Sequence, residues 1–215
     1  MFYGVDYYPE HWDEERWETD ARLMHEAGMN IVRIGEFAWS KLEPDDDVFD
    51  FGWLDKVVRI LEKNNIRVVL GTPTAAPPKW LMDKCPDIYP IDEYGRRKEF
   101  GVRCHRCYSS LNLIKYARRI IKEMAEHFKG NPTVYGWQID NELGGRCFCD
   151  NCKHAFQDWL REKYKSINAL NKEWGTIFWS QTYRDFGEII VPSYYVQDGV
   201  NFHNPGLLLD FYRFS

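Results

Sequence analysis

Short apolar segments alternate with amphipathic ones along the chain. Residues 2–6 (FYGVD) and 30–35 (NIVRIG) are short and rich in aromatic or β-branched side chains, which predicts two strands. Between them, residues 13–27 carry apolar side chains at helical spacing, and Gly28 follows as a natural C-cap. The pattern therefore begins as strand, helix, strand.

The alternation continues through most of the chain. We predict further helices over residues 53–64, 109–129, 152–164 and 167–174, and further strands over residues 66–71 and 132–140. Ser109 or Ser110 is expected to cap the helix that follows them. The last nine residues, 207–215 (LLLDFYRFS), follow an Asn-Pro pair and indicate a helix that is just starting.

Strands that alternate with helices predict a parallel sheet with right-handed crossovers. A doubly wound sheet and a (β/α)₈ barrel both fit this order, but no GxGxxG or P-loop motif follows a strand, which weakens the first. Polar residues gather directly after the predicted strands, at Asp6, Glu36, Thr72, Asn141 and Glu142. Since a (β/α)₈ barrel keeps its active site at the strand ends, this placement favours the barrel.

Four strands fall in the first 140 residues, and a complete barrel needs roughly 200–250 residues. We therefore predict an α/β fold that forms the N-terminal half of a (β/α)₈ TIM barrel. Residues 1–215 are expected to be the N-terminal part of a catalytic domain, with the remainder of the barrel and any C-terminal domains absent. A half barrel leaves two open sheet edges, which would favour aggregation if it stood alone.

Composition narrows the classes of function. The 28 Lys and Arg against 33 Asp and Glu give a net charge of −5 with no basic stripe, so a nucleic-acid partner is not expected. Aromatic residues reach 16%, and an excess of Trp and Tyr beside carboxylates suits a sugar-binding cleft. No signal peptide or membrane span is evident, so the cytoplasm is the expected location. There, six Cys are expected to be reduced thiols or metal ligands.

The end of the fourth predicted strand carries the first candidate chemistry, in the segment Trp137 to Glu142 (WQIDNE). A glutamate at a strand end, beside an amide and a tryptophan, suits proton transfer to a glycosidic oxygen. Asn141 could hold a sugar hydroxyl in an oxocarbenium-like transition state. The alternative is a solvated turn from strand to helix, which a bare Asp-Asn-Glu tripeptide more often is.

A cysteine cluster follows. Cys147, Cys149 and Cys152 form a C-x-C-x2-C motif, with Cys104-His105-Arg106-Cys107 upstream. Four thiolates make a closed tetrahedral shell for structural zinc, with no open position for catalysis. Spacing alone leaves open whether Cys104, His105 or Cys107 completes the site, and unligated thiols are the alternative.

Two isolated residues remain. Arg33 lies inside an apolar strand and needs a charged partner, for which Glu36 and Glu142 are the candidates. Trp179, in the segment FWSQ, is either a core residue or a platform for a sugar ring.

As a set, these segments resemble the N-terminal part of glycoside hydrolase family 42 β-galactosidases. The matching stretches are Tyr7–Trp12, Arg33–Ser40, Thr72–Pro78, Gly136–Glu142, the cysteines of residues 147–152, Ala169–Gln181, Asn204-Pro205 and Asp210–Phe214. The resemblance covers essentially the whole chain. Asn-Glu alone is shared by the wider clan of retaining (β/α)₈ glycosidases, whereas the set is specific.

The resemblance implies a retaining β-galactosidase that hydrolyses terminal non-reducing β-D-galactosyl residues. Glu142 matches its acid/base, Asn141 the residue that holds the 2-hydroxyl, and Arg103 and Trp179 match galactose-subsite residues. The zinc ligands of some members match Cys107, Cys147, Cys149 and Cys152, in a Cys-rich loop after the fourth strand. Cys104 stands where the family has another residue type. The full-length parent is implied to be a homotrimer.

The family's nucleophile is a glutamate late in the barrel, and its equivalent would lie beyond Ser215. We therefore expect the 215-residue chain alone to be inactive. Two other hypotheses remain. One is another retaining glycosidase of the clan, such as a cellulase or mannanase, which the cysteine cluster and Thr72–Pro78 argue against. The other is a non-catalytic, zinc-stabilised carbohydrate-binding remnant, which a second catalytic glutamate beyond Ser215 would exclude.

Overall fold

The computed structural model describes residues 1–197, 199 and 203–215. Its internal contacts divide the chain into two compact units. The first, here called the sheet unit, comprises residues 1–86, 100–105 and 115–143. The second, the helical unit, comprises residues 87–99, 106–114 and 144–215. Each unit is described on its own.

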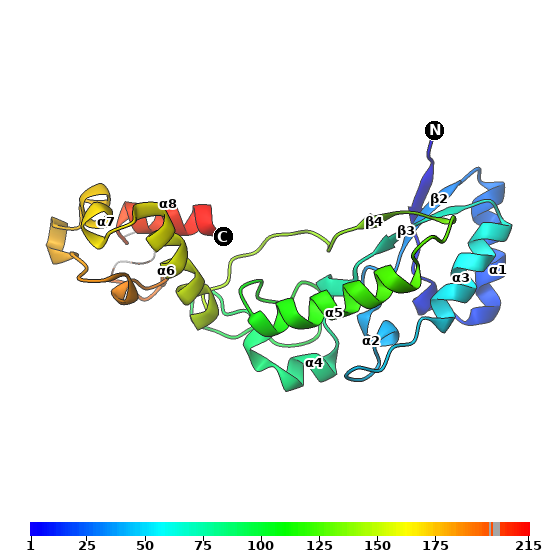
Figure 1. The fold of residues 1–215 in the computed structure, drawn as a ribbon, viewed down its shortest axis with the longest axis horizontal. Helices are drawn as coiled ribbons and strands as arrows, with labels where there is room; N and C mark the ends of the chain where they lie inside the picture. The colour runs from blue at the N-terminus through cyan, green and yellow to red at the C-terminus, as the bar shows by residue number, and fades with distance from the viewer. Residues whose placement is uncertain (198, 200–202) are drawn as a thin grey trace. The chain divides into compact units, whose positions relative to one another are not determined.

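The sheet unit is built on four parallel strands in the order β1-β2-β3-β4. The strands are β1 (Gly4–Asp6), β2 (Ile31–Ile34), β3 (Arg67–Gly71) and β4 (Val134–Gln138) (Figure 1). Because neighbouring strands are parallel and in sequence order, each connection crosses over through a helix-bearing segment. The predicted α/β fold with a parallel sheet is confirmed.

Helices fill these connections. They are α1 (Glu14–Glu26), α2 (Trp39–Leu42), α3 (Gly52–Lys63), α4 (Lys79–Lys84) and α5 (Leu111–His127). Helix α3 packs against both α1 and β3 (Figure 1). It buries Leu54, Val58 and Leu61 on one face, and Val68 and Leu70 of β3 are fully buried. Burial of this apolar stripe is what holds the helices to the sheet.

The predicted elements lie close to the observed ones. Helix α1 ends with Ala27 as C-cap, and Gly28 follows with φ +81°, the left-handed conformation expected of a glycine there. Ser110 caps α5, since its Oγ accepts from the Leu113 N–H at 3.1 Å. The sequence analysis missed α2 and α4, which have four and six residues and carry no periodic pattern long enough to detect.

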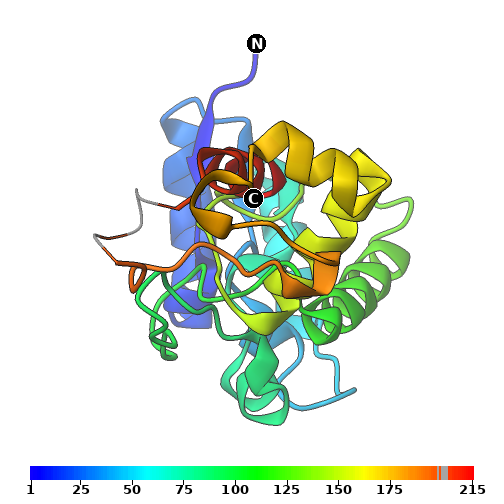
Figure 2. The same cartoon turned by 90° about the vertical axis from the view of Figure 1, so that its left-hand side faces the viewer.

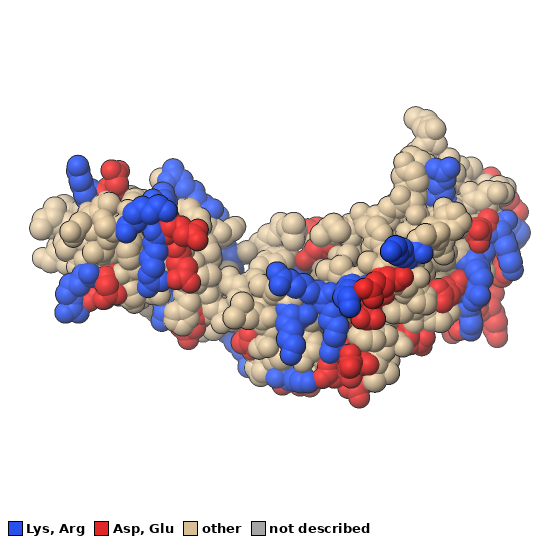
Figure 3. Space-filling view, viewed as in Figure 1, with Lys and Arg blue, Asp and Glu red and all other residues tan. Residues whose placement is uncertain are grey.

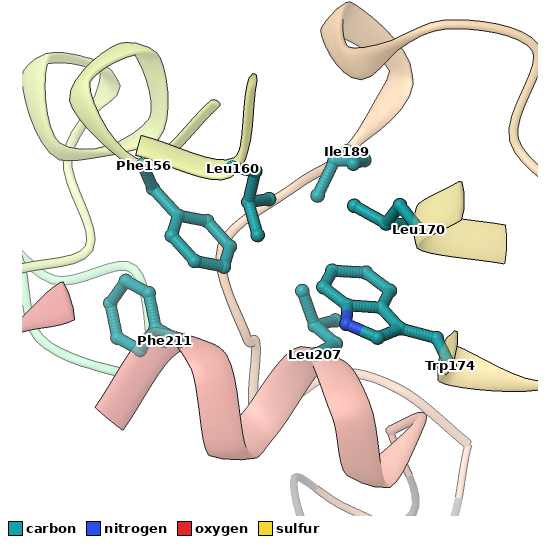
Figure 4. Packing of buried hydrophobic residues seen from close by; sticks show 7 residues of the cluster. All are labelled: Phe156, Leu160, Leu170, Trp174, Ile189, Leu207 and Phe211. Atoms are coloured by element: carbon teal, nitrogen blue, oxygen red, sulfur yellow. The ribbon is translucent and has the colours of Figure 1, made fainter. Parts of the chain in front are cut away.

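The helical unit contains α6 (Asp150–Tyr164), α7 (Ile167–Trp174) and α8 (Pro205–Phe214), the last two seen in yellow and red in Figure 2. Its core draws on all three helices and on one loop residue (Figure 4). The buried members are Phe156, Leu160, Leu170, Trp174, Ile189, Leu207 and Phe211. The segment that indicated a starting helix therefore lies in α8.

A single acidic residue ties these helices together. Asp210 of α8 accepts hydrogen bonds from Tyr164 Oη at 2.6 Å and Trp174 Nε1 at 3.1 Å, and forms ion pairs with Lys163 and Arg213. Burial by itself would raise the pKa of Asp210, but these hydrogen bonds and charges outweigh it and lower the pKa. The carboxylate thus stays ionised inside the unit.

The surface carries both signs of charge. On the face drawn in Figure 3, Lys and Arg are interspersed with Asp and Glu. None of the helices among the described residues combines the length and apolar character needed to cross a membrane.

Candidate active site and cysteine cluster

The carboxyl ends of the four strands bring polar side chains to one edge of the sheet unit. Asp6 ends β1, Glu36 follows β2, Thr72 follows β3, and Asp140 follows β4. Gly71, the last residue of β3, permits the backbones to approach, because a Cβ on it would lie 2.4 Å from Glu36 Cβ and 2.7 Å from Glu36 Cα. A larger residue at position 71 would push Glu36 away from the strand ends.

Glu36 is fully buried and is held by two groups from the first strands. Its Oε1 accepts from Arg33 Nε at 2.9 Å and from Tyr8 Oη at 3.0 Å. Arg33 therefore pairs with Glu36, one of the two partners that the sequence left open. Burial, with hydrogen bonds to Asp6 and Glu36, raises the pKa of Tyr8 to about 12, so the phenol remains protonated at neutral pH.

The turn after β4 is fixed by hydrogen bonds within the sheet unit. Thr72 Oγ1 accepts from the Asp140 N–H at 2.7 Å, and Gln138 Nε2 donates to Asn141 Oδ1 at 3.0 Å. Asp140 and Glu142 both adopt positive φ, at +56° and +48°. Non-glycine residues rarely occupy this region, and such strained conformations gather at functional sites. Because of these two residues, the backbone that carries Asn141 and Glu142 does not continue as an extended strand beyond β4.

Glu142 lies beside a cation at this edge. Its Oε2 is 2.7 Å from Arg103 Nη1, and both side chains are exposed, by 66% and 44%. The Arg103 guanidinium also lies 5.6 Å from the centre of the Phe37 ring, within range of a cation–π contact. The hydrogen bond to Glu142 raises the pKa of Arg103, which remains charged. Of the four residues predicted to act on a sugar, the structure brings Arg103, Asn141 and Glu142 into this one unit.

Trp179, the fourth, belongs to the helical unit. It lies in a short 3₁₀ turn, Phe178–Ser180, and is 72% exposed, so it is not a core residue. Its ring centre lies 4.4 Å from that of Phe178, and both Trp179 and Ser180 have positive φ. An exposed aromatic face held by an unusual backbone suits ligand contact better than packing.

Four cysteines of the helical unit form a compact cluster. The sulfurs of Cys107, Cys147, Cys149 and Cys152 all lie within 4.8 Å of one another. Cys107 Sγ is 3.4 Å from Cys152 Sγ and 3.5 Å from Cys149 Sγ. Zinc bonded to four thiolates at about 2.3 Å would separate the sulfurs by about 3.8 Å, so the observed spacing fits that ion after small shifts.

Backbone hydrogen bonds place Cys107, and not Cys104, beside the other three cysteines of the cluster. The Cys107 N–H donates to the Ile88 carbonyl at 2.7 Å, inside the helical unit, whereas the Cys104 N–H donates to the Ala75 carbonyl at 2.7 Å, inside the sheet unit. Cys107 thus completes the group, and Cys104 and Cys85 lie outside it. The Ile91 N–H donates to Cys147 Sγ at 3.4 Å, a contact that would stabilise this sulfur as a thiolate.

Sequence reasoning missed the residues that support both sites. Asp87 accepts from Ser110 Oγ at 2.5 Å and Asn112 Nδ2 at 2.8 Å, and so links the loop before the cluster to the start of α5. In the sheet unit, Tyr8 supports Glu36 in a role that the sequence did not indicate, whereas Thr72 was already expected at the strand ends.

Comparison with known proteins identifies the family to which the chain belongs. The family model described as beta-galactosidase, glycoside hydrolase family 42, matches residues 6–215. A β-galactosidase of Thermus thermophilus is 51% identical over 216 residues, which cover 99% of this chain and 33% of that protein. The chain therefore spans about a third of the length of this relative.

Solved structures of β-galactosidases are also similar to this chain. A β-galactosidase from the psychrophilic Marinomonas ef1 has a TM-score of 0.93 and 44% identity, covering 98% of this chain and 32% of the other. Gan42B, a family 42 β-galactosidase, has a TM-score of 0.94 and 36% identity, covering 100% and 31%. The match over nearly every residue, together with the strand-end carboxylates, shows that the chain belongs to the family 42 β-galactosidases.

Proposed function

We propose that residues 1–215 form the N-terminal part of the catalytic barrel of a retaining β-galactosidase. Its substrates would be terminal, non-reducing β-D-galactosyl groups. The relatives named above support the reaction, since each is a β-galactosidase. The share of their length that this chain spans, about a third, supports a barrel of which the four strands are one part.

Glu142 is the proposed acid/base. The observation that carries this assignment is its position in the turn that follows β4, beside Asn141 and with its Oε2 2.7 Å from Arg103 Nη1. In the first step Glu142 gives a proton to the leaving oxygen, and in the second it takes a proton from water. Arg103 can be displaced from Glu142 during this cycle, because an exposed ion pair contributes only about 0–1 kcal/mol to stability.

The other sugar contacts follow from the same assignment. Asn141 would hold the 2-hydroxyl, a contact that strengthens in the transition state. Arg103 and Trp179 each match a residue that contacts galactose in the family, and each is proposed to keep that role. Retention needs a second carboxylate about 5–5.5 Å from the first. Glu36 does not suit that role, because Arg33 and Tyr8 already occupy its Oε1 and the side chain is fully buried.

The cysteine cluster is proposed to hold one structural zinc ion. Cys107, Cys147, Cys149 and Cys152 would supply four thiolates, and the metal would join the loop around residue 107 to the start of α6. The donor set supports this choice, since soft thiolates in a closed tetrahedron select zinc and leave no position for substrate. The homotrimer implied by the resemblance and the cytoplasmic location expected from the sequence belong to the same proposal.

A hybrid protein tests the proposal. Residues 1–215 replace the matching segment of the Thermus thermophilus β-galactosidase, and lactose hydrolysis is measured beside the isolated chain. We expect the hybrid to hydrolyse lactose, its Glu142→Gln variant to lose about 10²–10⁴-fold in kcat, and the isolated chain to be inactive. An active Glu142→Gln hybrid, or an isolated chain whose activity survives that substitution, would exclude the assignment.

A further inference from the structure

The sulfur positions in the cluster place two thiols close to that of Cys107. Cys107 Sγ lies 3.4 Å from Cys152 Sγ and 3.5 Å from Cys149 Sγ, and a disulfide needs about 2.0 Å. Cys107 comes from the segment before α5, while Cys149 and Cys152 lie at the start of α6. A shift of little more than 1 Å between these two segments would bring the sulfurs to bonding distance.

We propose that Cys107 is a redox modification site. When the cluster holds no metal, a peroxide-class oxidant would close a disulfide between Cys107 and one of the two α6 thiols, Cys149 or Cys152. This inference is independent of the proposed galactosidase activity, because it concerns only the thiols of the helical unit.

Burial assigns the order of the two steps. Cys147 is partly exposed, Cys149 and Cys152 expose 7% and 6% of their surface, and Cys107 exposes none. Peroxide therefore reaches a thiol of residues 147–152 before it reaches Cys107. That sulfur attacks one peroxide oxygen, the O–O bond breaks, and a sulfenic acid and one water form.

Cys107 then acts as the resolving thiol. Its sulfur attacks the sulfenic sulfur, the S–O bond breaks, and the second water leaves with the Cys107 proton. In sum, two thiols and one peroxide give one disulfide and two waters. The two electrons lost by the sulfurs reduce the O–O bond.

Metal and disulfide exclude one another at this site. A sulfur in a disulfide is no longer a thiolate ligand, so the link removes two of the four donors. By the same linkage, bound zinc must suppress the oxidation, and oxidation must release zinc. Either form ties residue 107 to α6 across 45 positions of sequence, by coordination when reduced or by a covalent bond when oxidised.

Trypsin places Cys107 in one peptide and the three downstream cysteines of the cluster in another. Cleavage after Arg106 and Lys115 gives peptide 107–115, and cleavage after Arg146 and Lys153 gives peptide 147–153. The proposed link joins these two peptides. A disulfide between Cys149 and Cys152, the obvious competitor because the two form a C-x-x-C motif, stays within peptide 147–153 and lowers its mass by two hydrogens.

The experiment uses the 215-residue chain, freed of metal by a chelator under reducing conditions and treated with one equivalent of hydrogen peroxide. Alkylation, digestion and mass spectrometry then locate the products. We expect the joined peptides 107–115 and 147–153, and a loss of two titratable thiols from six per chain. Cys85→Ser, a thiol outside the cluster, should leave this pattern unchanged, and Cys107→Ser should abolish it.

A second arm adds zinc before peroxide. Zinc should slow formation of the joined peptides, and each disulfide formed should release one zinc ion to a chromogenic chelator. A link confined to peptide 147–153, prior oxidation of Cys85 or Cys104, or equal rates with and without zinc would overturn the proposal. Should Cys107→Ser fail to fold, the peptide pattern of the unsubstituted chain still decides between the two links.

Discussion

Arg103 Nη1 lies 2.7 Å from Glu142 Oε2, at the carboxyl edge of the sheet. The Phe37 ring also lies in contact with the guanidinium, 5.6 Å from its carbon to the ring centre. An arginine in this position can hand its hydrogen bonds from the carboxylate to a ligand hydroxyl without leaving the site. In the proposed assignment, substrate binding would release Glu142 for proton transfer, while Arg103 stays paired with a polar group.

The first prediction concerns this arginine. In the hybrid protein, Arg103→Met should lower kcat/KM for lactose by about 10–100-fold, since a hydrogen bond to a charged group contributes about 1.5–3 kcal/mol. Steady-state kinetics measures it. The matched control is Arg22→Met on α1, whose exposed partner is Glu26 and which should leave kcat/KM unchanged. Equal kinetics for the two variants would remove Arg103 from the site.

A second prediction concerns the stability of the sheet unit. Arg119 of α5 forms ion pairs with Glu43, whose side chain is fully buried, and with Asp46 at 2.7 Å. Arg119→Met would leave Glu43 buried without its charge partner, at a cost of about 3–5 kcal/mol in the free energy of unfolding. Urea unfolding measures this. Arg118→Met, on the exposed side of the same helix, should change stability by less than about 0.5 kcal/mol.

A third prediction links pH to the helical unit. The folded-state pKa of Asp210 is lowered, so its contribution to stability is present above the unfolded value of 3.8 and is lost as pH falls through the folded pKa. Asp210→Asn should cost about 2–3 kcal/mol at pH 6 and clearly less at pH 2–3. Thermal unfolding at both pH values tests this. A pH-independent difference in Tm, or an equal loss in the exposed Asp158→Asn control, would contradict it.

A fourth prediction concerns the metal content of the cysteine cluster. Metal analysis of protein purified without chelator should give about one zinc per chain, as expected for one closed four-thiolate site. Chelation should lower the Tm, because binding energy at such a site is folding energy. Cys147→Ser should lower zinc content, and Cys104→Ser, outside the cluster, should not. A stable chain with four alkylatable cluster thiols and no zinc would refute the metal site.

The elements predicted well from sequence are those with long apolar stripes. Helix α3 has five buried apolar residues at helical spacing, and such a stripe can be read without knowing what covers it. Helices α2 and α4 escaped because distant contacts hold them. Glu43, which follows α2, is held by an ion pair with Arg119 of α5, and Trp80 Nε1 of α4 donates to the Glu43 carbonyl at 2.9 Å. No local pattern encodes contacts of that kind.

In the candidate sites, too, residues marked by a local pattern could be predicted and residues placed by distant contacts could not. Glu142 could be placed from sequence because it follows a recognisable strand, and the C-x-C-x2-C motif marked three cysteines of the cluster. The fourth could not be chosen by spacing, since Cys104 and Cys107 are three residues apart. Their backbone partners, Ala75 and Ile88, lie far from them in sequence and send them to different units.

Chemical rescue tests the role of Glu142 most directly. In the Glu142→Ala hybrid, an aryl β-galactoside with a good leaving group needs little protonation and should still form the galactosyl-enzyme. Azide can then attack that intermediate without a general base. We predict that azide restores turnover and yields galactosyl azide of β configuration, while lactose hydrolysis stays severely reduced and an exposed Glu62→Ala control shows neither effect. Unimpaired lactose hydrolysis by Glu142→Ala, with no azide product, would contradict the assignment.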